Sequence, residues 1–285
     1  MERLRVYCSV PLTRHLAGLT AIGLENYSFV DANRQPGYDR SRFLSKKEIR
    51  MREKLLILLI FVGGVELSAQ TIVQQFAALS SGGGGQVSDM DLNTPTGEGH
   101  VLIAMPELLS AGVKVVSVTD NAPGGGNTYK QVPGASSSCP NRLIDIWYCE
   151  NCKSGVTELK FHLSGGVKGS INGFIELSNM PKSSVLDGSG VHLNDGTVTG
   201  GGLEVGPQIT TTARDFIVAR YPLTVPGPGP QGVIPATWKF TTSYVYELNG
   251  PSGTYQPTLT GAKAAANFCM SLAAFKTAAS VDASH

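Results

Sequence analysis

Residues 100–132 read HVLIAMPELLSAGVKVVSVTDNAPGGGNTYKQV, and this stretch decides the fold class. It holds three short apolar runs, at 100–105, 113–118 and 128–132. Turn residues separate the runs, above all the Gly, Pro, Asn and Asp of DNAPGGGN, which supply the fixed or positive φ angles of tight turns. Short apolar runs bounded by such residues predict β-strands.

The same alternation of apolar runs and turn residues continues on both sides of this stretch. Spacings near ten residues with few helical patterns are typical of a β-sandwich or barrel. We expect strands at Thr71–Ala77, Gln86–Leu92, His100–Met105, Val113–Val118, Thr128–Val132, Arg142–Cys149, Val156–Leu163, Lys168–Leu177, Asp215–Tyr221, Trp238–Leu248, Tyr255–Leu259 and Asn267–Phe275, and one helical turn at Met105–Leu109. The sequence therefore predicts an all-β protein with a single antiparallel β-sandwich over residues 70–278 and a disordered tail at 279–285.

The composition suits this architecture. The chain has 285 residues, 34 Gly, 16 Pro, 41% hydrophobic and 16% charged residues, which is enough apolar material for a core. Residues 70–285 carry 12 Lys and Arg against 15 Asp and Glu, a net charge of −3. A nucleic-acid binder needs a basic surface to displace counterions from phosphates, so we expect no nucleic-acid partner.

Residues 51–70, MREKLLILLIFVGGVELSAQ, have the order of an export signal. A basic start is followed by the apolar run Leu55–Val65, and small residues close the segment. The run has 11 residues, whereas a helix needs about 20 to cross a bilayer. We predict a signal peptide at 51–69, with cleavage that leaves Gln70 first and no membrane span in the mature chain. A buried helix is the alternative.

The export signal lies after 50 further residues, although signal peptides are N-terminal. Residues 1–50 show no sustained period of 3.6 or 2 and end in clustered charges. The simplest interpretation is that Met51 is the true start and that residues 1–50 are an unstructured extension upstream of it. A cytoplasmic leader with a signal anchor is the alternative.

Four stretches, in this order, resemble a family of uncharacterised exported bacterial proteins. They are residues 100–132, quoted above, RLIDIWYCENCKSGVTELKFHLSG at 142–165, TTTARDFIVA at 210–219 and NFCMSLAAFKTA at 267–278. The family patterns are VTDxxGNTY, IYYAxN with TVTF, TTTANELIVG and a closing AAFK strand. The loop NAPGGGNTY is longer here, and two Cys replace ordinary residues in YCENC. The resemblance implies a jelly-roll-like β-sandwich in an extracellular or periplasmic setting, without an established activity or catalytic residues.

Four cysteines follow the signal: Cys139, Cys149, Cys152 and Cys269. An even number in an exported chain favours disulfides. An extended Arg142–Cys149 would span about 23 Å, so it argues against a Cys139–Cys149 bond, which needs Cα atoms within about 7 Å. Cys149 and Cys152 are close by construction, and we predict that they pair. The pairing of Cys139 with Cys269 stays open. A redox role for CxxC would need a helix after the motif, and a zinc site would need a second pair of ligands; the sequence predicts neither.

Trp147 and Asp145 are the candidate ligand-binding residues. Because side chains alternate between the two faces of a strand, an extended Arg142–Cys149 places them on the face opposite to that of Ile144 and Ile146. On an outer face, the indole could stack on a sugar and the carboxylate could accept hydroxyl hydrogen bonds. In the alternative, both faces of this strand are covered and Trp147 belongs to the core, as large aromatic residues usually do.

Asp120, Asn121 and Asn127 are weak candidates for metal binding. Their oxygens are hard ligands of the kind that calcium prefers, so a structural calcium ion is the one cofactor considered, and an ordinary Asx turn is the alternative. The sequence holds no GxSxG, HExxH or P-loop motif, and no catalytic residue is assigned.

We therefore expect an exported non-catalytic module with a binding or structural role at the cell surface or in the periplasm. Its partner would be a glycan or another cell-surface component. A secreted hydrolase acting on polysaccharide and an adhesin or matrix subunit are the alternatives.

Overall fold

The computed structural model describes residues 70–80, 84–139, 141–193, 203–222, 231–260 and 269–277. The extension predicted at 1–50, the signal peptide predicted at 51–69 and the tail predicted at 279–285 lie outside the described residues. All described residues belong to one structural unit, Glu66–His285. The described part of the chain holds no helix with the length and hydropathy needed to span a bilayer.

All regular structure in the described residues is β-structure, in antiparallel pairs, as predicted. The strands are β1 (Thr71–Ser80), β2 (Val87–Asp91), β3 (His100–Leu108), β4 (Val115–Asp120), β5 (Lys130–Gln131), β6 (Ser137–Cys139), β7 (Arg142–Ile144), β8 (Trp147–Cys152), β9 (Glu158–Leu163), β10 (Ser170–Ser178), β11 (Leu186–Leu193), β12 (Leu203–Val205), β13 (Ile209–Thr211), β14 (Asp215–Arg220), β15 (Gly232–Ile234), β16 (Lys239–Phe240), β17 (Tyr244–Gly250), β18 (Gly253–Tyr255), β19 (Thr258–Thr260) and β20 (Cys269–Lys276).

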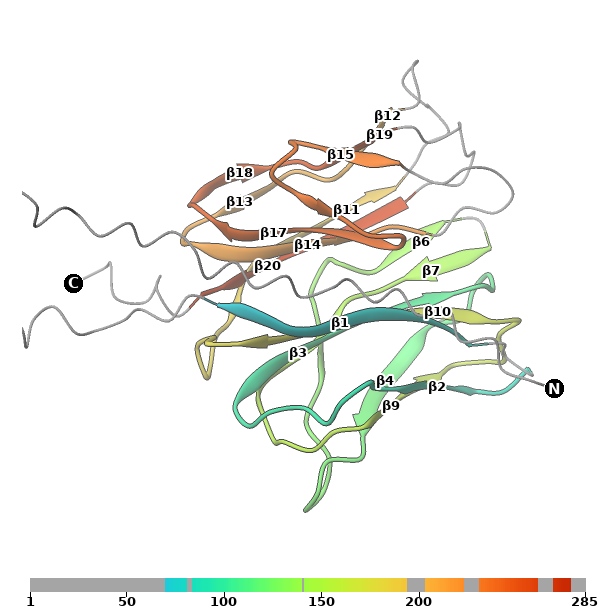
Figure 1. Ribbon diagram of the computed structural model, residues 1–285. Helices are drawn as coiled ribbons and strands as arrows, with labels where there is room; N and C mark the ends of the chain where they lie inside the picture. The colour runs from blue at the N-terminus through green and yellow to red at the C-terminus, as the bar shows by residue number, and fades with distance from the viewer. Residues whose placement is uncertain are drawn as a thin grey trace, which may run out of the picture. The chain divides into compact units, whose positions relative to one another are not determined.

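Two large sheets face each other at the centre (Figure 1). The seven-stranded sheet has the order β1-β10-β3-β7-β6, with β8 paired to β3 and to β5. The five-stranded sheet has the order β11-β20-β14-β17-β16. The sheet β2-β9-β4 covers the outer side of the first, and the small sheets β12-β19-β15 and β13-β18 cover the outer side of the second. The predicted sandwich is confirmed, and each of its sheets carries a further layer.

Three hydrophobic cores separate the four layers. The first core, which includes Leu102, Phe174 and Phe161, lies between β2-β9-β4 and the seven-stranded sheet. The second core, which includes Ile103 and Phe275, lies between the two large sheets. The third lies between the five-stranded sheet and the small outer sheets. Leu102 and Ile103 are neighbours that point to opposite faces of β3, and both are fully buried.

The layers explain the uninterrupted apolar runs of the sequence. A strand with one wet face alternates apolar and polar residues, whereas a strand covered on both faces reads as a continuous apolar run. The segments Val101–Met105, Phe216–Ala219 and Leu272–Phe275 are such runs, and every residue in them is buried.

Several expectations about elements were wrong. The expected strand Trp238–Leu248 is divided into β16 and β17, and Tyr255–Leu259 falls partly in β18 and partly in β19. Met105–Leu109 forms no helical turn, because β3 continues to Leu108 and pairs with β10 over this stretch. The expected strand Arg142–Cys149 is divided into β7 and β8 at Asp145, whose backbone N–H donates to the carbonyl of Pro106. Short strands, namely β6, β12, β13 and β15, and the Gly-containing β11 were not predicted.

Candidate functional site

Trp147 and Asp145 lie in the core. The exposed fractions are 7% for Trp147 and 0% for Asp145. The indole Nε1 donates a 2.9 Å hydrogen bond to Asp145 Oδ2, which also accepts a 2.8 Å bond from Gln131 Nε2. Burial raises the pKa of Asp145 to about 6, although these donors act in the opposite direction. The structure contradicts an exposed stacking platform at Trp147, because the neighbouring sheet β2-β9-β4 covers this face.

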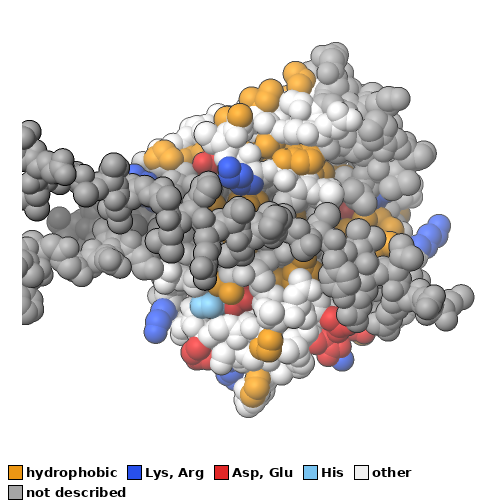
Figure 2. Space-filling model, viewed as in Figure 1, with side chains coloured by type: hydrophobic (Ala, Val, Ile, Leu, Met, Phe, Trp, Pro, Cys, Tyr) orange, Lys and Arg blue, Asp and Glu red, His pale blue; other side chains and the backbone are white. Residues whose placement is uncertain are grey.

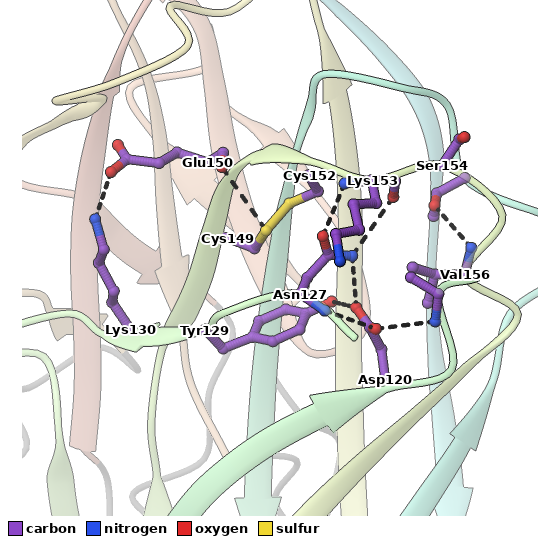
Figure 3. The surroundings of a disulfide bond; sticks show 12 residues. Asp120, Asn127, Tyr129, Lys130, Cys149, Glu150, Cys152, Lys153, Ser154 and Val156 are labelled. Carbon is purple, nitrogen blue, oxygen red and sulfur yellow. Dashed lines mark hydrogen bonds and ion pairs between the residues drawn. A yellow bond between two sulfur atoms is a disulfide. The ribbon is translucent and has the colours of Figure 1, made fainter. Parts of the chain in front are cut away.

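Asp120 organises the DNAPGGGN loop (Figure 3). Its Oδ1 accepts hydrogen bonds of 3.0 Å from the backbone N–H groups of Ala122 and Asn127. Its Oδ2 accepts from Asn127 Nδ2 at 2.7 Å and from the Tyr129 hydroxyl at 2.9 Å. Burial first, and the nearby Asp120 charge second, raise the pKa of Tyr129 well above its ordinary value. Both carboxylate oxygens are therefore used to hold the loop.

Asn121 points away from this loop and toward the start of β9. Its Oδ1 accepts from the backbone N–H groups of Thr157 and Glu158, at 2.9 and 3.0 Å. In the described part of the chain, no three His, Cys, Asp or Glu side chains gather as a metal site. Asp120, Asn121 and Asn127 do not fit a calcium ion, because their oxygens accept N–H and O–H donors and do not converge. The Asx-turn alternative describes this loop.

Cys149 and Cys152 form the predicted disulfide, with Cα atoms 5.9 Å apart. In a regular strand, residues three apart point to opposite faces. Here β8 carries a bulge, because His100 pairs with Cys152 and Leu102 with Cys149, which leaves one extra residue on β8. Asn151 in the bulge has a φ of 51°. The bulge turns both cysteines into the first core, where they are 3% and 1% exposed.

Lys153 joins the turn after this disulfide to the DNAPGGGN loop (Figure 3). Its backbone N–H donates to Asn127 Oδ1 at 2.7 Å, and its ammonium group donates to the carbonyl of Gly124 at 3.3 Å and to that of Gly125. The Gly-rich loop is thus held by the carboxylate of Asp120 and by the ammonium group of Lys153.

His100 and Glu176 form a pair that the sequence did not reveal. Glu176 is fully buried and accepts a 2.5 Å hydrogen bond from His100 Nδ1, whose side chain is 21% exposed. It also accepts from the backbone N–H of Gly97 at 2.8 Å and from Gln74 Nε2 at 2.7 Å. A carboxylate that binds one ring nitrogen fixes the orientation of the imidazole. The available sequence signal was a Glu within the apolar strand SINGFIELS.

Glu107, Arg142 and Arg220 form a second buried charge cluster, between the two large sheets. Glu107 Oε2 accepts a 2.9 Å bond from Arg220 Nη2, and Glu107 Oε1 accepts from Arg142 Nη1. Arg220 is fully buried and also donates to the carbonyls of Met105, Ile171, Tyr221 and Ser243. Burial lowers the pKa of the Arg220 guanidinium, against the charge of Glu107. These contacts give the Glu107 carboxylate and the Arg220 guanidinium their hydrogen-bond partners, and they link the two large sheets.

Asp187 and Asp215 form a carboxyl pair at the end of the five-stranded sheet. Burial first, and the Asp187 charge second, raise the pKa of Asp215 to about 7. Burial opposes ionisation of Asp187 as well, but hydrogen bonds of 2.6 and 2.7 Å from Thr212 and the ammonium group of Lys276 at 3.5 Å hold its pKa below the ordinary value. The side chain of Asp187 is 4% exposed. Both carboxyl groups are thus largely withdrawn from solvent.

A surface hollow of about 850 Å³ lies where β3 ends and β10 begins. Its lining includes Ser110, Asn141 and Lys168 among the polar residues and Leu109 and Val167 among the apolar ones. Elsewhere the described surface is mixed, and on the face shown in Figure 2 the Lys and Arg side chains lie apart from one another. The hollow is a place where a small polar ligand could bind.

The comparisons with known proteins add no family to this description. No family model matches the chain, and no curated protein matches it. The fold and the sites define an all-β protein with two disulfides in its described residues.

Proposed function

We propose that the chain is an exported, non-catalytic β-sandwich module with a binding or structural role at the cell surface or in the periplasm. The observation that carries this proposal is the pairing of all four described cysteines, Cys139 with Cys269 and Cys149 with Cys152. Disulfides form and persist in oxidising compartments outside the cytoplasm. The signal peptide predicted at 51–69 and the resemblance to exported bacterial β-sandwich proteins support the same setting.

The buried charge clusters support a structural role. Glu107 and Asp120 each accept hydrogen bonds from fixed donors of the same chain. Groups that are fully bonded inside the fold stabilise one arrangement of strands and have little capacity left for chemistry.

Expression of the full chain in a bacterial host with a periplasm tests this proposal. Intact mass of the exported protein should show a start at Gln70, and non-reducing peptide mapping should show both disulfides. The control is Leu58→Lys, which interrupts the apolar run of the signal and should leave the protein in the cytoplasm. Cytoplasmic retention of the unaltered chain, or export with Met1 retained, would contradict the proposal.

Within this role we propose a glycan as the partner, bound at the hollow near Lys168. The support is chemical: Ser110, Asn141 and Lys168 line the hollow, and hydroxyl, amide and ammonium groups bind sugar hydroxyls by hydrogen bonds. The large hydrophobic residues that are exposed in the described part are aliphatic, so stacking on an aromatic platform is not part of this proposal.

A glycan-array screen of the exported protein tests the partner. Lys168→Ala should reduce binding to any glycan that scores, whereas Lys239→Ala, an exposed lysine of β16 outside the hollow, should leave it unchanged. Equal binding by both variants would exclude the hollow, and an array without a reproducible signal would exclude the glycan.

Hydrolysis is the second candidate function, and the pair His100–Glu176 favours it. An imidazole that is partly exposed and oriented by a buried carboxylate has the arrangement of a general base. If the protein hydrolyses polysaccharide through this pair, His100→Gln should abolish product release while His162→Gln on β9 should not. Unchanged turnover in His100→Gln would exclude this role.

A further inference from the structure

β1 is the outer strand of the seven-stranded sheet (Figure 1). It pairs with β10 on one side, and no other described strand pairs with its free edge. An extra residue, Val73, makes a bulge between Ile72 and Gln74, after which Gln74–Ser80 pairs without a break. A regular seven-residue run of backbone donors and acceptors therefore lies along this edge.

This edge lacks the features that normally prevent strands from associating. Natural edge strands are short, or carry charges or Pro. The other edge strands of the described residues follow this rule: each has at most three residues or holds a charged side chain, such as Asp89 of β2 or Asp120 of β4. β1 reads TIVQQFAALS over ten residues, without a charge or a Pro. Leu79 on β1 is 74% exposed, more than any other large hydrophobic residue described.

The chemistry of β1 suits a second copy of itself. Antiparallel pairing of two Gln74–Ser80 runs has its twofold axis at Ala77, and it places Phe76 opposite Ala78 and Gln75 opposite Leu79 of the other copy. Residues directly opposite in an antiparallel pair lie on the same face. The large Phe76 thus meets the small Ala78, the two Ala77 residues meet without a clash at the axis, and the uncharged run brings no like charges together.

The residues before Gln70 directly precede β1, so in the unprocessed chain they could compete with a second copy for this edge. Under the proposed function they are a signal peptide and are removed at export, so they do not compete in the mature protein. The inference therefore rests on the proposed function at this one step.

We propose that the exported protein forms a twofold dimer in which the β1 strands of two copies pair antiparallel about Ala77. The two seven-stranded sheets then form one continuous sheet across the dimer.

Sedimentation velocity of the exported wild-type protein should show a concentration-dependent monomer–dimer equilibrium. The double variant Ala77→Lys/Leu79→Lys places charges on exposed positions of the edge and should weaken dimerisation at least tenfold. The matched control is Val116→Lys, which likewise replaces an exposed hydrophobic residue by Lys, at a 62% exposed position of β4. This variant should dimerise as the wild type does. Circular dichroism confirms that the variants keep their β-structure.

Ala77→Cys tests the register directly, since each new thiol should face its counterpart and form a disulfide-linked dimer on mild oxidation, whereas Val116→Cys should not. Three results would overturn the pairing: a wild-type protein that is monomeric at every accessible concentration, a dimer insensitive to the double variant, or an Ala77→Cys dimer that forms no cross-link. A chain that is not exported contradicts the proposed function, and a chain that is exported but monomeric contradicts only the dimer.

Discussion

Cys139 and Cys269 lie 130 residues apart in the sequence, yet their Cα atoms are 5.8 Å apart and their sulfurs are bonded. Cys139 belongs to β6 of the seven-stranded sheet and Cys269 to β20 of the five-stranded sheet. The bond therefore ties the two central sheets together, and Ile144 packs against it.

The two disulfides should differ in what they contribute to stability. Replacing Cys139 and Cys269 together by Ala should lower the free energy of unfolding by about 4–5 kcal/mol, since the chain-entropy model gives about 4.7 kcal/mol for a 100-residue loop. Replacing Cys149 and Cys152 together should cost less than the roughly 3 kcal/mol of a 15-residue loop. Urea unfolding of both double variants measures the difference, and equal losses would contradict it.

Trp147→Ala should lower the free energy of unfolding by about 3–5 kcal/mol, because the buried indole leaves a cavity in the first core. Trp147→Phe keeps most of the packing and removes the N–H donor to Asp145, so its loss should be smaller. Thermal and urea unfolding of both variants provide the test. A loss within about 0.5 kcal/mol for Trp147→Ala is the size expected of a surface residue and would exclude core burial.

Stability should fall as the pH rises from about 4 to about 7. The folded-state pKa of Asp215 is raised to about 7, above the value of about 3.9 in an unfolded chain. In this window the folded state holds a proton that the unfolded state has lost, so raising the pH favours unfolding, and the effect levels off above pH 7. Each pKa unit corresponds to about 1.4 kcal/mol.

Asp215→Asn is the variant that tests this pH dependence. It should unfold with a flatter pH profile and gain roughly 2 kcal/mol over the wild type at pH 8, because an amide carries no charge to bury. Asp187→Asn is the control, and it should lower stability at pH 8, since the pKa of Asp187 is depressed in the folded state. A wild-type profile retained in Asp215→Asn would show that another group is responsible.

Arg220→Met should cost about 3–5 kcal/mol, because it leaves the Glu107 carboxylate buried with one partner fewer. Adding Glu107→Gln should recover part of this loss, since the uncompensated charge is then removed. A double-mutant cycle from urea unfolding gives the coupling free energy between the two residues. Strictly additive losses would mean that Glu107 and Arg220 do not depend on each other.

Local patterns predicted the strands well, but not the number of layers. The uninterrupted run Val101–Met105 is typical of a strand covered on both faces, but nothing in it says which segments form the further sheet that covers its outer face. The burial of Trp147 depends on that layer, which is built from β2, β4 and β9.

The pairs that hold the candidate sites together are non-local. His100 and Glu176 are 76 residues apart, and Arg220 and Glu107 are 113 residues apart. Contacts at these separations depend on which strands become neighbours, and no period of two along one strand contains that information. The disulfide of Cys149 and Cys152 could be predicted because only two residues separate its partners.

The bulge that brings Cys149 and Cys152 to one face also has a consequence for the alignment of strands. A one-residue slip of β8 along β3 would exchange the faces of Trp147 and Tyr148, which now enter different cores. The bond closes the ring around the extra residue and keeps the bulge at this place on the strand. By fixing the place of the bulge within β8, it favours the one alignment on β3 in which each of the two aromatic rings enters its own core.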